Sequence, residues 1–311
     1  MLACIFPGQG AQSPGFLHRL PSHPIVEATI AEAADVLSLD ILTLDTPEAL
    51  QSSVAVQIGL LVAGVATARR LADEGFDIAL TAGLSVGAYA AAVTCNALAF
   101  TDALHLIRKR AELMERAYPR GYGLSAIEGL TEHEVQRLAN ESTGSESRVY
   151  IANVNAPRQI VIAGSDAALD SYNARALSLG AHRAQRLAVS VPSHCELLAA
   201  ACEELTAYAA DVPVCAPRAV YVGNRTARPL RTADAIRDDL VTNMRHTVRW
   251  FDALTVIVEL GATLIVEAPP GQVLSSIAAA TYPEVSALAA AAIPDERLIP
   301  LLHKRLAAGG G

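Results

Sequence analysis

The sequence has few aromatic and few charged residues, and it lacks any excess of positive charge. Of its 311 residues, 18% are charged and 5% are aromatic, and the formal net charge is −8. Nucleic acid is therefore not an expected partner, because phosphate binding needs clustered Lys and Arg. The hydrophobic share of 52% allows a large buried core and excludes a disordered chain.

Cysteine is scarce, and no apolar run in the sequence is long enough to span a membrane. The five cysteines (4, 95, 195, 202, 215) form no C-x-x-C motif, which predicts reduced, mostly buried thiols in a cytoplasmic protein. The best candidate for a membrane span, Ile58 to Ala68, ends at Arg69-Arg70, so we expect none. No signal peptide is expected at the N-terminus either. The histidines lack ligand spacing, and no metal is expected.

What the sequence does contain is a G-x-S-x-G motif, Gly83-Leu-Ser-Val-Gly87. It lies between an expected buried strand at 77–82 and a small-residue helix at 88–93. This order is typical of a nucleophile elbow, in which Ser85 occupies a strained turn. The N–H of Val86 and the helix dipole can then stabilise an oxyanion. The bare motif also fits an ordinary turn, but its context favours acyl chemistry through a serine ester.

A serine nucleophile needs a base, and His194 in Val189-Ser-Val-Pro-Ser-His-Cys195 is the best placed histidine. Pro192 stiffens the loop, and we expect His194 to open a helix. A structural histidine that caps this helix is the alternative. Cys195 is a competing nucleophile, although Ser85 lies in the better-shaped turn.

Arg110 falls on the apolar stripe of the helix expected at 102–117, for which Thr101 is the expected N-cap. A guanidinium on a core-facing stripe is costly unless it is paired. One interpretation is a buried ion pair with a carboxylate such as Glu267. The other is a fork that holds a carboxylate on the substrate.

The loop after the first expected strand is a further candidate. In Phe6-Pro-Gly-Gln-Gly10, the N–H of Gln9 is a second possible oxyanion donor. Gly8 and Gly10 would let the loop approach the serine closely. A plain tight turn is the alternative, and no G-K-[ST] follows to make a phosphate loop.

Strands alternate with helices over 1–122 and again over 189–311, which predicts one large α/β domain around a largely parallel sheet. Residues 123–188 have the order β-α-β-β-α-β, which is typical of a ferredoxin-like subdomain. Strands are expected at 2–6, 77–82, 124–130, 149–154, 159–163, 181–188, 219–223 and 263–267. Helices are expected at 24–37, 47–51, 54–75, 88–93, 102–117, 131–142, 165–179, 195–208, 233–243 and 251–260.

Several ordered blocks along the whole chain resemble the malonyl-CoA:acyl carrier protein transacylase family. Besides the motifs above, they are Val154-Asn-Ala-Pro-Arg-Gln-Ile-Val-Ile-Ala-Gly164, Gly223-Asn224, Val248-Arg-Trp250 and Glu267-Ala-Pro-Pro-Gly271. The resemblance implies an α/β-hydrolase-like large domain with a ferredoxin-like insert. It implies transfer of malonyl from malonyl-CoA to the phosphopantetheine-type thiol of a small acyl carrier protein, with no cofactor of the enzyme's own.

The resemblance also assigns roles to single residues. It implies Ser85 as nucleophile, His194 as base, Arg110 and Asn155 as substrate-binding, the N–H groups of Gln9 and Val86 as oxyanion donors, and the backbone carbonyl of Arg249 as the group that orients His194.

Three positions depart from the family pattern. Leu84 stands where a histidine is usual, Ala88 where an acidic residue is common, and Arg249 where glutamine is usual. With Leu84 and Ala88, the motif resembles that of the acyltransferase (epsilon) subunit of malonate decarboxylase. We therefore expect the chain to be such a subunit, with other decarboxylase subunits as further partners. The alternative is the transacylase of fatty-acid or polyketide synthesis. We hypothesise that the Arg249 side chain faces CoA phosphates or an acidic carrier.

Two rivals come from other classes: a serine thioesterase or esterase, and a non-catalytic carrier-binding scaffold. The esterase usually needs an acid that orients the histidine, and none is evident in the sequence. Because acyl carriers tend to be acidic, we expect a local basic face on this acidic chain. Its candidates are Arg183, Arg186, Arg245 and Arg249.

Overall fold

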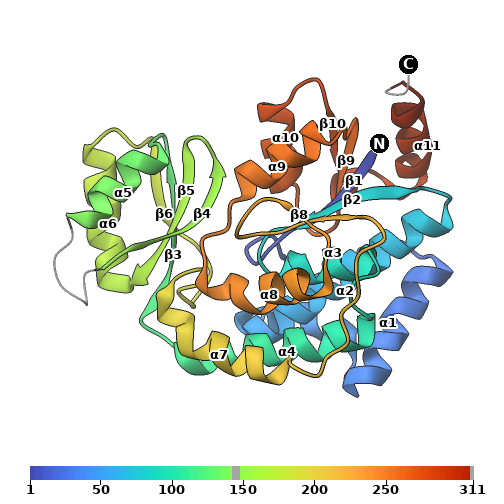
Figure 1. The fold of residues 1–311 in the computed structure, drawn as a ribbon, viewed down its shortest axis with the longest axis horizontal. Coiled ribbons are helices and arrows are strands. Elements are labelled where there is room, and N and C mark those ends of the chain that lie inside the picture. Colours follow the sequence, from blue (N-terminus) through green and yellow to red (C-terminus); the bar gives the residue numbers. More distant parts are fainter. Residues whose placement is uncertain (142–147, 309–311) are drawn as a thin grey trace.

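The computed structural model describes residues 1–141 and 148–308 and shows two sheets with helices packed on them (Figure 1). The larger sheet has the order β10-β9-β1-β2-β7-β8. Neighbouring strands of this sheet run parallel, except that β8 pairs antiparallel with β7. The predicted largely parallel sheet is therefore confirmed. Its strands are β1 (Leu2–Phe6), β2 (Ile78–Gly83), β7 (Val220–Val222), β8 (Pro229–Leu230), β9 (Leu264–Glu267) and β10 (Ser286–Ala289).

Both faces of this sheet are covered, because successive side chains of a strand point to opposite faces. Leu2, Cys4 and Phe6 of β1 belong to one core, whereas Ala3 and Ile5 belong to the other. The first core packs under α1 (Pro24–Leu37), α2 (Ser53–Asp73), α3 (Gly87–Thr94), α4 (Phe100–Ala117), α7 (Ala199–Tyr208), α8 (Ala233–Thr242) and α11 (Asp295–Ala308). The second packs under α9 (Trp250–Glu259) and α10 (Val273–Thr281).

A second, antiparallel sheet of order β4-β5-β3-β6 lies beside the first, and we call it with its helices the antiparallel layer (Figure 1, green). Its chain order is β-α-β-β-α-β, as predicted. One face packs on α5 and α6, and the other contacts Val189 and Cys195, next to His194. The elements are β3 (Tyr122–Glu128), α5 (Glu132–Asn140), β4 (Tyr150–Ala156), β5 (Gln159–Ser165), α6 (Asp166–Ser178) and β6 (Arg183–Arg186).

Backbone hydrogen bonds join the two layers. The N–H of Val154 donates to the carbonyl of Val248 at 2.9 Å, and the N–H of Val248 donates to that of Ala152 at 2.9 Å. The end of β4 is therefore tied to the segment that precedes α9, close to the carboxyl end of the parallel sheet.

Some expected elements differ from the structure. Thr101 is not an N-cap: α4 begins at Phe100, and the preceding Ala99 makes no capping side-chain bond. The helix expected at 47–51 is only a 3-10 turn, Ala49–Gln51. Ser142, the expected end of the helix at 131–142, lies outside the described residues. The sequence did not predict α10, β10 or α11. Small residues carry little periodicity through the first two, and Pro300 interrupts the third.

The long helix α2 bears on the expectation about membrane spans. By length and composition it could cross a bilayer, but 89% of its apolar window is buried inside the protein. An all-round apolar helix in such surroundings is a core helix. It packs against α1, α3 and α4.

Candidate active site

The turn between β2 and α3 holds Ser85 in a left-handed conformation, with φ of 56°. A Cβ atom on Gly83 would lie 1.9 Å from the carbonyl carbon of Gly87, and one on Gly87 would lie 2.3 Å from the oxygen of Phe6. Both distances are far below contact, so only glycine allows strand, turn and helix to approach this closely. The predicted strained elbow is present, with a non-glycine residue at positive φ.

His194 lies directly against the serine. Its Nε2 is 2.7 Å from Ser85 Oγ, and its Nδ1 is 2.7 Å from the backbone oxygen of Asn243. Because a carbonyl can only accept, Nδ1 carries the proton and Nε2 accepts from the Ser85 hydroxyl. Burial, and then the nearby Arg110 charge, lower the pKa of His194 to about 4. The imidazole is therefore neutral at pH 7 and able to take a proton.

The orienting carbonyl is not the one that the resemblance assigned. The oxygen of Arg249 accepts from the N–H of Ala253 in the first turn of α9, so it is occupied by the helix. Asn243, at the end of α8, supplies the contact to His194 instead. His194 itself has φ of 65° and precedes the 3-10 turn Glu196–Leu198, so it does not open a helix as expected.

Arg110 reaches the same point from α4. Its side chain is fully buried, and it donates to Gln57 Oε1 at 2.6 Å, to Ser85 Oγ at 3.2 Å and to Asn243 Oδ1 at 3.2 Å. Among the described residues no carboxylate pairs with it. The ion pair with Glu267 is wrong, because Glu267 accepts from the N–H and hydroxyl of Ser275 on α10.

The loop after β1 approaches the elbow, as its glycines predicted. A Cβ on Gly8 would meet Leu84 Cδ2 at 2.6 Å. The Gln9 side chain accepts from Gln57 Nε2 at 3.1 Å, which links the loop through Gln57 to Arg110. Over the described residues, the N–H groups of Gln9 and Val86 make no hydrogen bond. Two backbone donors, one in the elbow and one in the loop that contacts it, are thus uncommitted.

Two asparagines that received no role in the predictions from the sequence hold the elbow. Asn224 Oδ1 accepts from the N–H of Ser85 at 2.8 Å, and Asn243 Nδ2 donates to the Ser85 carbonyl oxygen at 3.4 Å. Asn224 follows β7, and its own N–H donates to Asp239 Oδ1 at 2.9 Å. Its place just after a predicted strand was a usable signal. Asn243, the last residue of an expected helix, gave none.

Asn155 lies near the end of β4 and is buried, and its side-chain oxygen has no partner among the described residues. No hydrogen bond in that part of the chain joins it to Ser85, His194 or Arg110. In the same part, no three His, Cys, Asp or Glu side chains gather where they could hold a metal ion. Cys195 is buried and its pKa is raised to about 12, mainly by burial, so it is a poor nucleophile.

A cleft of about 940 Å³ opens beside His194, between the antiparallel layer and the segment before α9. Arg148 and Arg245 line it. Of the four arginines expected on a basic face, three are neutralised: Arg183 pairs with Glu128, Arg186 with Asp166 and Asp170, and Arg249 with Glu132 and Asp252. Arg245 alone of these has no ion pair within the described chain.

The chain is similar to known acyltransferases along almost its whole length. The Acyl transferase domain family matches residues 3–308. The malonyl CoA-acyl carrier protein transacylase of Salmonella typhimurium is 38% identical over 281 residues, which is 88% of this chain and 91% of that protein. The chain belongs to the acyltransferase family of malonyl CoA-acyl carrier protein transacylases. It is an acyltransferase.

Solved structures of this family have the same fold. The transacylase of Coxiella burnetii superposes with a TM-score of 0.92 at 32% identity and covers 98% of this chain, with 97% of its own length matched. A malonyl-transacylase solved in complex with its type II PKS acyl-carrier protein superposes with a TM-score of 0.91 at 34% identity, covering 97% and 99%. The mixed α/β fold with separate parallel and antiparallel sheets is therefore that of the family. Two predictions stay untested: the α/β-hydrolase-like and ferredoxin-like descriptions, and the domain bounds 1–122, 123–188 and 189–311.

Proposed function

We propose that this acyltransferase moves malonyl from malonyl-CoA to the phosphopantetheine-type thiol of an acyl carrier protein, through a malonyl ester of Ser85. The observation that carries the proposal is the environment of Arg110. This guanidinium is fully buried, lacks a carboxylate partner in the described chain, and lies 3.2 Å from the serine oxygen. A buried cation beside a nucleophile is matched by an acyl group that brings its own carboxylate.

In the first half-reaction, His194 Nε2 takes the hydroxyl proton while Ser85 Oγ attacks the thioester carbonyl. The N–H groups of Gln9 and Val86 hold the oxyanion. Collapse breaks the carbon–sulfur bond, and the CoA thiolate takes the proton from His194. In the second half-reaction the carrier thiol gives its proton to His194 and attacks the ester, and Ser85 leaves with that proton.

The cleft beside His194 supports the carrier as partner. Its volume is in the range of sites that enclose a ligand of moderate size. Its lining holds Arg148 and Arg245 against a single acid, Glu196, and this positive balance suits the phosphate of a phosphopantetheine arm. Substrate contact by Asn155, a cytoplasmic location and the lack of a resident cofactor stay predictions.

The related proteins support the general transacylase of fatty-acid or polyketide synthesis better than the malonate decarboxylase subunit that the sequence suggested. Leu84 and Ala88 are the observations that favour the decarboxylase subunit as a second candidate. Both are buried in the apolar surroundings of the elbow, and neither side chain makes a polar contact with Ser85. Transfer assays with a fatty-acid carrier and with a decarboxylase carrier separate the two.

The test is intact-protein mass after brief incubation with malonyl-CoA or acetyl-CoA. We expect a malonyl adduct on the wild type, little acetyl adduct, and none on Ser85→Ala. Addition of holo-carrier should discharge the adduct onto the carrier. Rapid release of free malonate in the absence of carrier would instead indicate a thioesterase, and absence of any adduct would indicate a non-catalytic scaffold.

Selectivity is tested with Arg110→Ala. Acetyl leaves the buried guanidinium without a counter-charge, a penalty of about 2–5 kcal/mol. We expect the variant to load malonyl more weakly and to discriminate less against acetyl-CoA. Unchanged selectivity would remove Arg110 from the proposed role.

A further inference from the structure

A second cavity, of about 400 Å³, lies apart from the cleft beside His194 and shares no lining residue with it. It is enclosed by the loop that follows Gly10, by the last turns of α2, and by the start of α11. Its walls are mostly apolar, and they include Phe16, Val26, Leu71, Pro270, Ile293 and Leu298.

A buried cation lies in this apolar wall. The Arg70 side chain is only 8% exposed, and one of its terminal nitrogens pairs with Asp295. Its Nε has no hydrogen-bond partner among the described residues. A guanidinium presents five donors, and the bond to Asp295 leaves part of this fork free. The terminal nitrogen that does not pair with Asp295 makes no hydrogen bond in the described chain, and a second carboxylate in the cavity would satisfy it.

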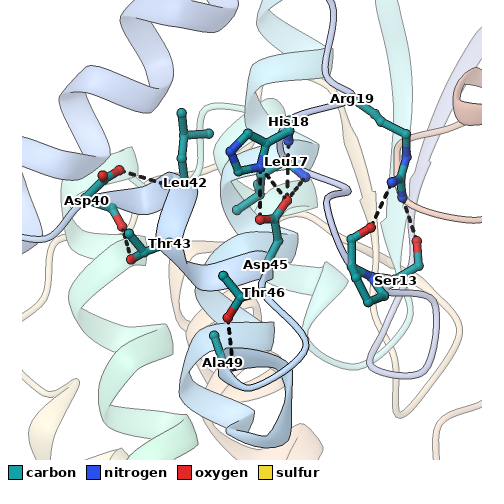
Figure 2. A network of polar contacts seen from close by, with 11 residues as sticks. Ser13, Leu17, His18, Arg19, Asp40, Leu42, Thr43, Asp45, Thr46 and Ala49 are labelled. Atoms are coloured by element: carbon teal, nitrogen blue, oxygen red, sulfur yellow. Dashed lines mark hydrogen bonds and ion pairs between the residues drawn. The ribbon is translucent and has the colours of Figure 1, made fainter.

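A second cation stands at the same cavity. Arg19 donates to the Pro14 oxygen at 2.8 Å and to Ser13 Oγ at 2.6 Å, and no acid pairs with it in the described chain (Figure 2). Two arginines and one aspartate therefore line the cavity, and the balance is one positive charge.

The wall that carries Arg19 is held in place before any ligand arrives. Asp45, which is buried, accepts from the N–H of Leu17 at 2.7 Å and lies 3.0 Å from His18 Nδ1 (Figure 2). The N–H of Gly15 donates to the Asp45 carbonyl at 2.9 Å. A pre-formed apolar cavity with a few fixed polar groups is the usual form of a small-molecule site.

We propose that this cavity binds a small aliphatic carboxylate. The carboxylate pairs with Arg70, Arg19 adds a second positive charge, and the hydrocarbon chain lies against Phe16, Leu71 and Leu298. The volume is at the low end of ligand sites, which are roughly 300–1,000 Å³. This limits the ligand to a short or medium chain. The inference does not depend on the reaction at Ser85.

Titration calorimetry with sodium octanoate tests the site, with octan-1-ol as the neutral probe. We expect saturable binding of one octanoate, unchanged in Ser85→Ala, and at least about tenfold weaker binding of octanol, because the charged pair is lost. Arg70→Met should weaken octanoate binding by at least about tenfold. Asp295→Asn is the matched control: it breaks the same ion pair but keeps the cation, so binding should persist.

A variant at the exposed lining position Ala291, Ala291→Phe, should reduce binding by filling the cavity and keeps the test open if Arg70→Met fails to fold. Equal affinity for octanol, or unchanged octanoate binding in these two variants, overturns the proposal. Loss of binding in Arg110→Ala but not in Arg70→Met would place the carboxylate at the Ser85 site and would also overturn it. Absence of saturable binding has the same consequence.

Discussion

At the scale of single residues, the proposed chemistry rests on three side chains, with Ser85 within hydrogen-bond distance of the other two. Ser85, His194 and Arg110 come from three different segments, and each is buried. Burial makes the histidine a neutral base and leaves the arginine a cation without a counter-charge in the described chain. In the proposed mechanism, the same desolvation serves both the activation of Ser85 and the selection of a charged acyl group.

The pH dependence of acylation follows from His194. Its pKa is lowered to about 4, first by burial and then by the Arg110 charge. The acid limb of kcat/KM for malonyl-CoA should therefore lie near pH 4 rather than near 6.5, because only the neutral imidazole accepts the serine proton. Arg110→Met should move this limb to higher pH. Stopped-flow CoA release from pH 4 to 8, over the range where circular dichroism shows an intact fold, measures it; a wild-type limb at 6.5 would contradict the assignment.

The same pKa shift affects stability. Between pH 6.5 and about 4 the unfolded chain binds a proton at this histidine that the folded chain excludes. The free energy of unfolding should therefore fall as the pH drops through this window, and the contribution is fully present above pH 6.5. His194→Gln should flatten the slope of that free energy against pH, as measured by urea unfolding at several pH values. An equal slope in both proteins would contradict the buried neutral state.

At the scale of elements, the elbow depends on contacts that arrive from other segments. The N–H of Ser85 donates to Asn224 at the end of β7, and Asp239 on α8 holds Asn224. Strand, turn and helix then approach at glycines where no side chain fits. The reactive conformation is therefore a property of β2, α3 and β7 together.

Asn224→Ala should slow malonyl-adduct formation by roughly 10- to 100-fold, because a buried N–H loses its acceptor. The effect should appear in kcat with little change in KM, since Asn224 contacts the backbone of the nucleophile. Asn224→Asp keeps the acceptor and is the control. Single-turnover adduct formation by mass spectrometry measures the rate, and a loss confined to KM would argue for direct substrate contact.

Gly87→Ala should destabilise the fold by about 4 kcal/mol or more, because its Cβ would clash with the Phe6 carbonyl. Gly10→Ala is the matched control. Gly10 has φ of 104°, but a Cβ atom there would meet nothing within 4 Å, so only the conformational cost of about 1–3 kcal/mol remains. Urea unfolding of both variants compares them. Similar losses would mean that close approach is not what fixes glycine at position 87.

At the scale of the whole molecule, the antiparallel layer forms one wall of the cleft beside His194. Backbone bonds at Val154 and Val248 tie it to the rest, and the Arg249–Glu132 pair spans the same boundary at 2.6 Å. The Arg249 charge is thus neutralised by Glu132 and Asp252, which does not support the hypothesis that it faces CoA phosphates.

A double-mutant cycle of Arg249→Gln and Glu132→Gln should give a coupling of at most about 1 kcal/mol, since both side chains are partly exposed to solvent. The backbone bonds of β4 carry more of the attachment. Urea unfolding of the four proteins measures the coupling. A value of several kcal/mol would make the ion pair the main link between the layers.

Much of the site was predictable because its residues lie in short local patterns. The strand, the glycines and the following helix around Ser85 predict an elbow within about ten residues, and the apolar stripe of α4 predicts that Arg110 points inward. The prediction of Thr101 as an N-cap was wrong because helix ends depend on a few backbone bonds that neighbouring elements can shift. The small residues of β10 and α10 carried too little periodicity to predict.

The sequence by itself determined the candidate chemical groups: a serine on an elbow, one well-placed histidine and an inward-facing arginine, each specified by neighbours along the chain. Only the tertiary structure decided the partners of these groups. Asn243 rather than Arg249 orients His194, Asn224 holds Ser85, and Arg110 avoids Glu267. The physical reason is that parallel strands bring their carboxyl ends together at one edge of the sheet. The hydrogen bonds of Ser85 and His194 to the two asparagines join residues 49 to 158 positions apart, and no local pattern encodes them.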